Sequence, residues 1–300
     1  MQYIKPTPLK TGDSAVIISP AGNVNYRCVS EAQRVLESWG INVQISEYAF
    51  AEYGRFAGTV DQRYQDIQNA MDRDDIQMIF CSRGGYGVVQ YLDRLSFDKI
   101  KAHPKWLIGF SDVTALHQVF LQERIISLHA PMAKHLAENK ADDISTSLKN
   151  ILFSGKHQLD IPPHPLNRAG NIMGRLFGGN LAVFCGLLGS KYISVPTNGI
   201  MFIEDIAESP YKIDRMLWGL KYSGILSQIK GLVVGRFEDC QEDESMKSSI
   251  NELIRQHVAE YDYPVVFNFP LGHIQENFPV LHGCEYILEV SDTSVSLTSL

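Results

Sequence analysis

Ser111 lies at the junction between a predicted strand and a predicted helix. The apolar run Trp106–Ile108 predicts the strand, which ends at Gly109, and Val113–Leu121 has the pattern of the helix. Such a junction in an α/β fold carries nucleophiles, and the N–H groups of the following helix favour developing negative charge. The segment matches Gly-x-Ser-x-Gly except that Val113 replaces the second glycine. Taken alone, it favours a simpler role for Ser111 as a helix cap.

Two further side chains could act together with this serine. Glu204 follows the apolar run Ile200–Ile203, where it could orient a histidine, although an ordinary acid at a helix start is equally compatible with the pattern. His273 lies in a loop flanked by glycine and proline, whereas the other eight histidines have no comparable setting. A serine needs a base to accept its proton, and the base needs a third group to fix its tautomer. Together the three residues therefore indicate a serine hydrolase.

A glycine-rich segment, Cys81–Gly87, follows another predicted strand. Glycines there let the backbone approach a ligand and expose N–H groups, as in an oxyanion hole or a phosphate cradle. The segment lacks the glycine patterns typical of nucleotide-binding loops, which makes a nucleotide binder the weaker hypothesis. The simplest alternative is a plain tight turn.

Composition excludes several other classes of protein. The chain has 300 residues, a formal net charge of -7 and no clustered basic patch, so a nucleic-acid surface is not expected. No apolar run is long enough to span a bilayer, and the N-terminus has no secretory pattern, which predicts a cytoplasmic protein. The five cysteines are far apart, and no histidine pair has zinc-ligand spacing, so neither a disulfide framework nor a metal is expected.

The chain divides into two parts by pattern. Its first half alternates strand and helix signals, which predicts an α/β fold with a mostly parallel sheet. The polar, proline-containing stretch 137–171 is interpreted as a linker with a short helix, and the boundary is placed near Asp160. We therefore predict one domain over residues 1–160, a linker to about 172, and a second domain over 173–300. The C-terminal segment predicts a β-hairpin of Tyr286–Val290 and Ser294–Thr298.

Several short motifs occur in an order that resembles the LD-carboxypeptidase family of serine peptidases. They span nearly the whole chain, and several motifs in the correct order are more specific than any one of them. The motifs are Gly12-Asp13, Ile17–Gly22, Phe56–Gly58, Arg83–Gly87, Gly109–Asp112, Gly178–Leu181, Glu204-Asp205 and Gly272-His273.

This resemblance implies a Rossmann-like parallel-sheet domain that carries Ser111 and a second, β-rich α+β domain that carries Glu204 and His273, with the active site between them. It implies no cofactor or metal, and a homodimer. The implied activity is release of terminal D-Ala from a murein tetrapeptide, by cleavage of an L,D-peptide bond during cell-wall recycling.

Three further residues are assigned roles in the mechanism of a serine peptidase. The N–H groups of Gly85 and Asp112 would hold the oxyanion, and Arg83 would clamp the terminal carboxylate or instead hold the glycine loop. Two alternatives remain open. One is a microcin-C-type immunity peptidase that acts on aminoacyl or peptidyl nucleotides, although 300 residues leave little room for its additional loop. The other is a non-catalytic module that binds cell-wall peptides.

Overall fold

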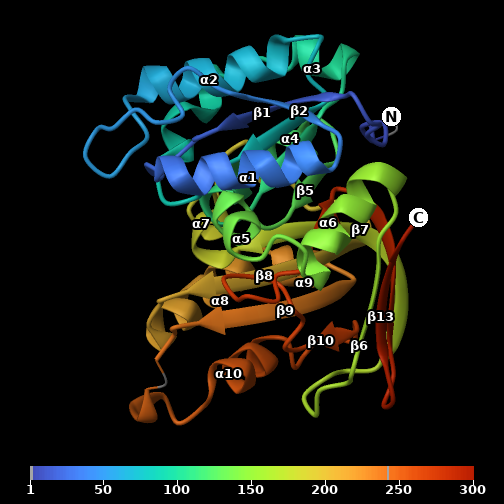
Figure 1. The fold of residues 1–300 in the computed structure, drawn as a ribbon. Helices are drawn as coiled ribbons and strands as arrows, with labels where there is room; N and C mark the ends of the chain where they lie inside the picture. The colour runs from blue at the N-terminus through green and yellow to red at the C-terminus, as the bar shows by residue number, and fades with distance from the viewer. Residues whose placement is uncertain (1–2, 242) are drawn as a thin grey trace. The chain divides into compact units, whose positions relative to one another are not determined.

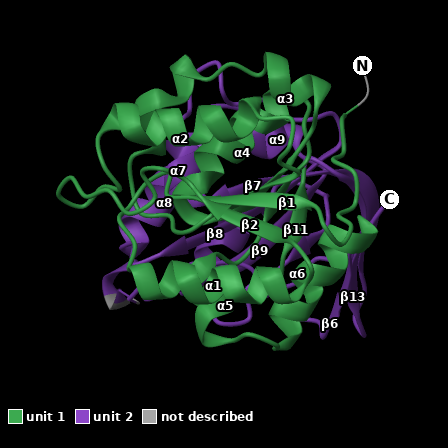
Figure 2. Cartoon of the chain, turned by 45° about the horizontal axis from the view of Figure 1, so that its top comes forward, with its two compact units in different colours: residues 1–156, 278–282 green, residues 157–277, 283–300 purple. Residues whose placement is uncertain are grey.

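The computed structural model describes residues 3–241 and 243–300, which form two compact units (Figures 1 and 2). Unit 1 is Met1–Lys156 together with the short segment Phe278–His282. Unit 2 is His157–Asn277 together with Gly283–Leu300. The chain therefore returns to unit 1 for a few residues before its C-terminal hairpin. Each unit is built around its own sheet, and the α/β class predicted from the sequence is confirmed.

Unit 1 holds a six-stranded sheet in the order β11-β5-β4-β3-β1-β2. The first five strands in the sequence are parallel to one another, and β11 pairs antiparallel with β5 at the edge of the sheet. Every residue of β3 and β4 is buried, which explains why both strands read as continuous apolar runs. The strands are β1 Ser14–Ile18, β2 Asn42–Ile45, β3 Met78–Cys81, β4 Trp106–Gly109, β5 Ser127–His129 and β11 Val280–His282.

Helices cover both faces of this sheet. Figure 2 shows α1 and α5 on one face and α2, α3 and α4 on the other. Helix α2 begins after Thr59, which forms a capping box with Gln62. The helices are α1 Tyr26–Ser38, α2 Val60–Asp72, α3 Asp98–Ala102, α4 Thr114–Gln122, α5 Ala133–Glu138 and α6 Asp143–Ser154, with 3₁₀ turns η1 Val88–Arg94 and η2 Ser111–Val113.

Unit 2 holds a seven-stranded mixed sheet in the order β10-β9-β8-β7-β12-β13-β6. Strands β7 to β10 are parallel, while β12, β13 and β6 add antiparallel pairs; β12 and β13 form the predicted C-terminal hairpin. Part of the predicted linker is thus integral to the fold, because β6 pairs with β13. The strands are β6 Gln158–Ile161, β7 Gly170–Asn180, β8 Gly199–Ile206, β9 Gly231–Glu238, β10 Val265–Val266, β12 Glu285–Val290 and β13 Val295–Ser299.

The helices of unit 2 are short, apart from the one that begins at Pro210. The segment Gly178–Asn180 ends β7, and the Asn180 side chain caps the five-residue α7. In the described part of the chain, no helix combines the length and the apolar character that crossing a membrane requires. The helices are α7 Leu181–Cys185, α8 Pro210–Tyr222, α9 Ile225–Gln228 and α10 Ile250–His257, with the 3₁₀ turn η3 Glu244–Met246.

Candidate active site

Ser111 has a left-handed backbone, with φ of 64°, at the turn between β4 and α4. A non-glycine residue adopts this conformation at an energetic cost, and such strain collects at functional sites. The residue at the N-cap of α4 is Val113, and its side chain makes no capping hydrogen bond. Ser111 therefore does not cap this helix, and the helix-cap interpretation was wrong. A strained strand-to-helix turn is the backbone geometry that exposes a nucleophilic serine in α/β-hydrolases.

The glycine loop after β3 lies directly against this turn. A Cβ on Gly84 would lie 2.8 Å from the Ser111 Cβ and 2.9 Å from its Oγ, so a side chain at this position has no room. The same Cβ position is 3.3 Å from the backbone nitrogen of Asp112. Gly85 has φ of 118°, and among the described residues no hydrogen bond is found for its N–H group. The backbone amides of Gly85 and Asp112 thus belong to segments that meet at Ser111.

Two buried charged side chains hold the glycine loop in place. The Asp112 carboxylate accepts a hydrogen bond from the Val88 N–H at 2.9 Å, and Arg63 donates from Nη1 to the Gly87 carbonyl at 2.9 Å. Burial raises the pKa of Asp112, while the Val88 N–H bond and the Arg63 charge oppose this shift. Arg63 was not found from the sequence, because an arginine on an amphipathic helix reads as exposed; its side chain is 1% exposed.

Replacing Gly84 with alanine is expected to lower kcat by about 10²-fold, because the new methyl group pushes against Ser111 and displaces the reacting oxygen. Steady-state kinetics and thermal unfolding would be measured together. Gly219→Ala is the matched control, since Gly219 lies in helix α8 with its nearest neighbour at 3.4 Å. Unchanged kcat in a folded Gly84→Ala protein would show that the contact does not position Ser111.

In unit 2, Glu204 and His273 form a hydrogen-bonded pair. His273 Nδ1 and Glu204 Oε2 are 2.7 Å apart, and the glutamate is fully buried on β8, which excludes the interpretation of Glu204 as an ordinary helix-start acid. Gly272 makes this approach possible, because a Cβ there would lie 2.9 Å from Glu204 Oε2. Its N–H donates to Asn277 Oδ1 at 3.0 Å, which fixes the loop. With Nδ1 bonded to a carboxylate, neutral His273 carries its hydrogen on Nδ1 and its lone pair on Nε2.

The electrostatics of this pair favour a protonated histidine. Burial alone would lower the pKa of His273, but the hydrogen bond and charge of Glu204, with the charge of Asp205, raise it overall. Burial raises the pKa of Asp205 itself to about 6. Asp205 accepts hydrogen bonds from Asn180 Nδ2 at 2.8 Å and from the Ala182 N–H at 2.9 Å, which fixes the end of β8 beside Glu204.

The six site residues expected from the sequence thus fall into two groups. Ser111, Asp112 and Gly85 lie together in unit 1 with Arg83, which is exposed and donates from Nη1 to the Asn23 carbonyl at 2.8 Å. Glu204 and His273 lie together in unit 2. Within the described ranges, no group of three or more histidine, cysteine, aspartate or glutamate side chains is arranged to hold a metal ion.

Comparison with known families gives two matches that together cover most of the chain. Residues 16–130 match the LD-carboxypeptidase N-terminal domain, and residues 173–288 match the LD-carboxypeptidase C-terminal domain. The chain belongs to the LD-carboxypeptidase family. The resemblance inferred from the motifs is therefore confirmed, and this LD-carboxypeptidase is a peptidase of the serine type.

Individual relatives agree with this assignment. The chain is 31% identical over 286 residues to the murein tetrapeptide carboxypeptidase of Pseudomonas aeruginosa, across 91% of this chain and 92% of that protein. The muramoyltetrapeptide carboxypeptidase structure from Oxalobacter formigenes matches with a TM-score of 0.88 at 27% identity, over 95% of this chain and 98% of that one. An MccF-like protein from Bacillus anthracis shares the fold, with a TM-score of 0.86 at 22% identity, over 99% of this chain and 100% of the other.

Proposed function

We propose that this LD-carboxypeptidase removes the terminal D-Ala from a murein tetrapeptide, using Ser111 as nucleophile, His273 as general base and Glu204 as the residue that orients the histidine. The cleaved bond joins an L-centre to D-Ala. The proposal includes a cytoplasmic role in cell-wall recycling and a homodimeric state. The named substrates of the relatives from Pseudomonas and Oxalobacter support the substrate class.

The observation that carries the nucleophile assignment is the left-handed backbone of Ser111, with φ of 64°, at a strand-to-helix turn. This conformation is costly for a serine, and here it occurs where the glycine loop meets the turn, with Gly84 against the Ser111 side chain. The 2.7 Å bond between His273 and Glu204 supports the second half of the assignment, because a general base needs such a partner.

The proposed reaction follows the acyl-enzyme route. Ser111 Oγ attacks the scissile carbonyl carbon while His273 Nε2 accepts the hydroxyl proton. The resulting oxyanion receives hydrogen bonds from the N–H groups of Gly85 and Asp112. The imidazolium, stabilised by Glu204, then protonates the amine of D-Ala as the C–N bond breaks. Water, deprotonated by the same histidine, attacks the ester, and Ser111 recovers its proton.

Recognition of the free terminal carboxylate is assigned to Arg83. Its Nη1 is engaged with the Asn23 carbonyl, and the rest of the planar guanidinium can still donate to a carboxylate. The same hydrogen bond supports the alternative in which Arg83 mainly holds the glycine loop. A changed KM with unchanged kcat in Arg83→Gln would favour the clamp, whereas loss of thermal stability with unchanged KM would favour the holding role.

The direct test is mass spectrometry of a purified tetrapeptide before and after incubation with the protein. We expect loss of one alanine residue and formation of the tripeptide. Release of no amino acid would contradict the proposal. Cleavage of an aminoacyl nucleotide but not of the tetrapeptide would instead establish the microcin-C-type activity, and tight tetrapeptide binding without cleavage would establish a binding module.

A further inference from the structure

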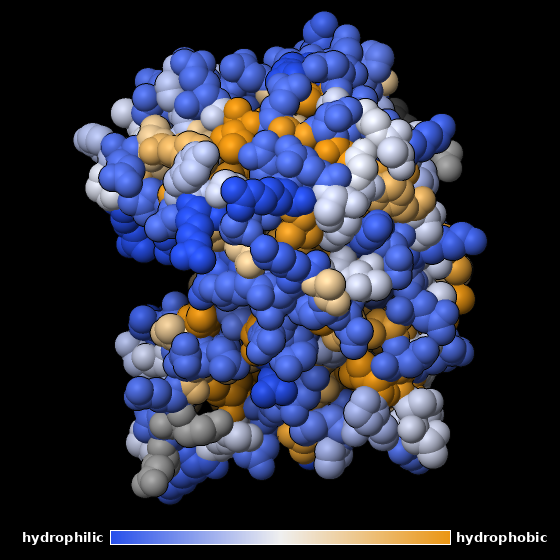
Figure 3. Space-filling model, in the orientation of Figure 1, coloured by the Kyte–Doolittle hydropathy of each residue, from blue (hydrophilic) through white to orange (hydrophobic). Residues whose placement is uncertain are grey.

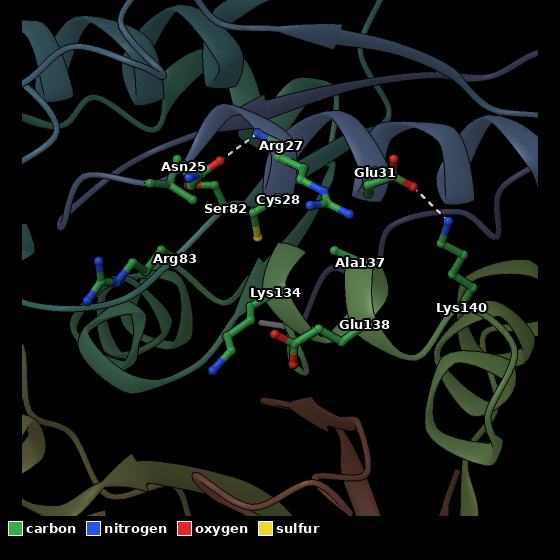
Figure 4. A pocket seen from close by; sticks show the side chains of 11 residues that line it. Asn25, Arg27, Cys28, Glu31, Ser82, Arg83, Lys134, Ala137, Glu138 and Lys140 are labelled. Atoms are coloured by element: carbon green, nitrogen blue, oxygen red, sulfur yellow. Dashed lines mark hydrogen bonds and ion pairs between the residues drawn. The ribbon is translucent and has the colours of Figure 1, made fainter.

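Three histidines that the proposed mechanism does not use are packed together inside unit 1: His117, His129 and His282. All three side chains are fully buried. By contrast, the surface of unit 1 over α1 and α5 is mostly hydrophilic (Figure 3), and the cavity beside these two helices is lined by other side chains (Figure 4). Buried polar groups need partners inside the protein, so the contacts of these rings show what the histidine cluster can do.

His117, on α4, joins two strands of the sheet through its two ring nitrogens. Its Nε2 is 2.8 Å from the Gly109 carbonyl oxygen at the end of β4, and its Nδ1 is 2.7 Å from Ser127 Oγ on β5. A carbonyl can only accept a hydrogen bond, so the hydrogen of the neutral ring is on Nε2 and the Ser127 hydroxyl donates to Nδ1. Burial lowers the pKa of His117 to about 4, although the bond to Gly109 opposes this shift, and the ring is therefore neutral near pH 7.

The other two rings of the cluster pack against His117. His282 is stacked on it with 5.3 Å between the ring centroids and 25° between the ring planes, and the His129 centroid lies at 6.4 Å. His282 comes from β11, so the short return of the chain to unit 1 supplies part of this packing. Gln118, the next residue of α4, donates from Nε2 to His282 Nε2 at 3.2 Å. The ring of His117 is therefore fixed by packing as well as by its own hydrogen bonds.

The Gly109 carbonyl belongs to the base of the turn that carries Ser111. It accepts a second hydrogen bond from the Ala130 N–H at 3.2 Å, so it is held both from α4 and from the end of β5. Two residues later, Ser111 has its left-handed backbone, a strained conformation that persists only when the surrounding structure over-determines it. The bond from His117 is a constraint of this kind, because it fixes the peptide plane from which the turn starts.

We propose that His117 is a positioning residue for the nucleophile: through the Gly109 carbonyl it holds the turn that orients Ser111 Oγ for attack. The inference rests on the proposed function. Because His117 is fully buried, it is not a contact for the substrate, and its loss should lower kcat while leaving KM unchanged. A purely structural role would lower the stability of the protein without making kcat depend on the bond to Gly109.

Two substitutions of similar polarity test the bond to Gly109. The amide nitrogen of glutamine lies close to the position of histidine Nε2 and can still donate to the carbonyl, whereas the shorter asparagine cannot reach it. His117→Asn should therefore lower kcat for D-Ala release by about ten-fold at unchanged KM, and His117→Gln should restore most of the activity. His157→Asn, at a buried histidine of unit 2, controls for the loss of a buried ring and should keep wild-type kcat. Equal kcat in folded His117→Asn and His117→Gln proteins would overturn the proposal.

Two measurements do not depend on cleavage of the tetrapeptide. Proton–nitrogen NMR correlation spectra of the wild-type protein, which need no variant, should show the hydrogen of His117 on Nε2; a hydrogen on Nδ1 alone would contradict the bond to Gly109. The rate at which a serine-directed phosphonate labels Ser111 should fall about ten-fold in His117→Asn but not in His117→Gln, and equal rates would contradict the positioning role. If the tetrapeptide is not cleaved but the labelling rates differ in this way, the proposed function fails and the positioning role stands.

Discussion

Replacing Ser111 with alanine is expected to lower kcat for D-Ala release by about 10⁶-fold, the loss seen when a serine peptidase is deprived of its nucleophile. Without Oγ no acyl-enzyme can form, and only the residual effects of substrate binding and the oxyanion-binding amides remain. The measurement is single-turnover release of alanine, followed by mass spectrometry. Treatment with a serine-directed phosphonate should leave a covalent adduct on residue 111 of the wild-type protein. The Ser111→Ala protein should form no such adduct.

Ser38→Ala is the matched control, since Ser38 is an exposed serine at the end of α1 in the same unit. It should retain wild-type kcat. Ser111→Gly should be as inactive as Ser111→Ala but more stable than it by about 1 kcal/mol, because glycine adopts the left-handed backbone at φ of 64° without strain. Wild-type activity in Ser111→Ala would eliminate Ser111 as the nucleophile.

Replacing Glu204 with glutamine is expected to lower kcat by about 10⁴-fold, in line with the loss of the carboxylate partner in other serine peptidases. The amide can favour the wrong tautomer of His273, and it no longer stabilises the imidazolium. The acid limb of the pH profile should also move. In the wild-type protein kcat/KM should fall as the pH drops through the pKa of His273, which is raised from the ordinary histidine value.

In Glu204→Gln the negative charge that raises the pKa of His273 is removed. Burial, the largest single influence, then lowers this pKa with the charge of Asp205 still opposing it. The acid limb should therefore shift to lower pH, as measured by kcat/KM between pH 4 and 9. Glu289→Gln, at an exposed carboxylate on β12 of the same unit, should change neither kcat nor the profile. An acid limb at the wild-type position in Glu204→Gln would show that His273 does not act as the base through this pair.

Much of the fold could be predicted from the sequence, because burial patterns are local. The apolar runs of β3 and β4 predict buried parallel strands. The alternation of apolar and polar residues after Glu285 predicts the hairpin of β12 and β13. Element ends were less predictable. Thr59 caps α2 although Asp61 is also a good capping residue, since the choice depends on which side chain meets the first N–H groups.

For the candidate site, the sequence by itself determined which residues stand at strand ends and loops, and the order of its motifs determined the family. It could not distinguish Ser111 as a helix cap from Ser111 as a nucleophile, because both roles place a serine before the same helix. The tertiary structure excludes the helix cap, because Val113 occupies the N-cap of α4, and the left-handed backbone of Ser111 and its contact with Gly84 support the proposed nucleophile. Two other contacts also join distant residues. Arg63 bonds to the glycine loop at Gly87, 24 positions away, and Glu204 bonds to His273, 69 positions away. Such pairs depend on how distant segments pack, and local patterns of residue type contain no record of that packing.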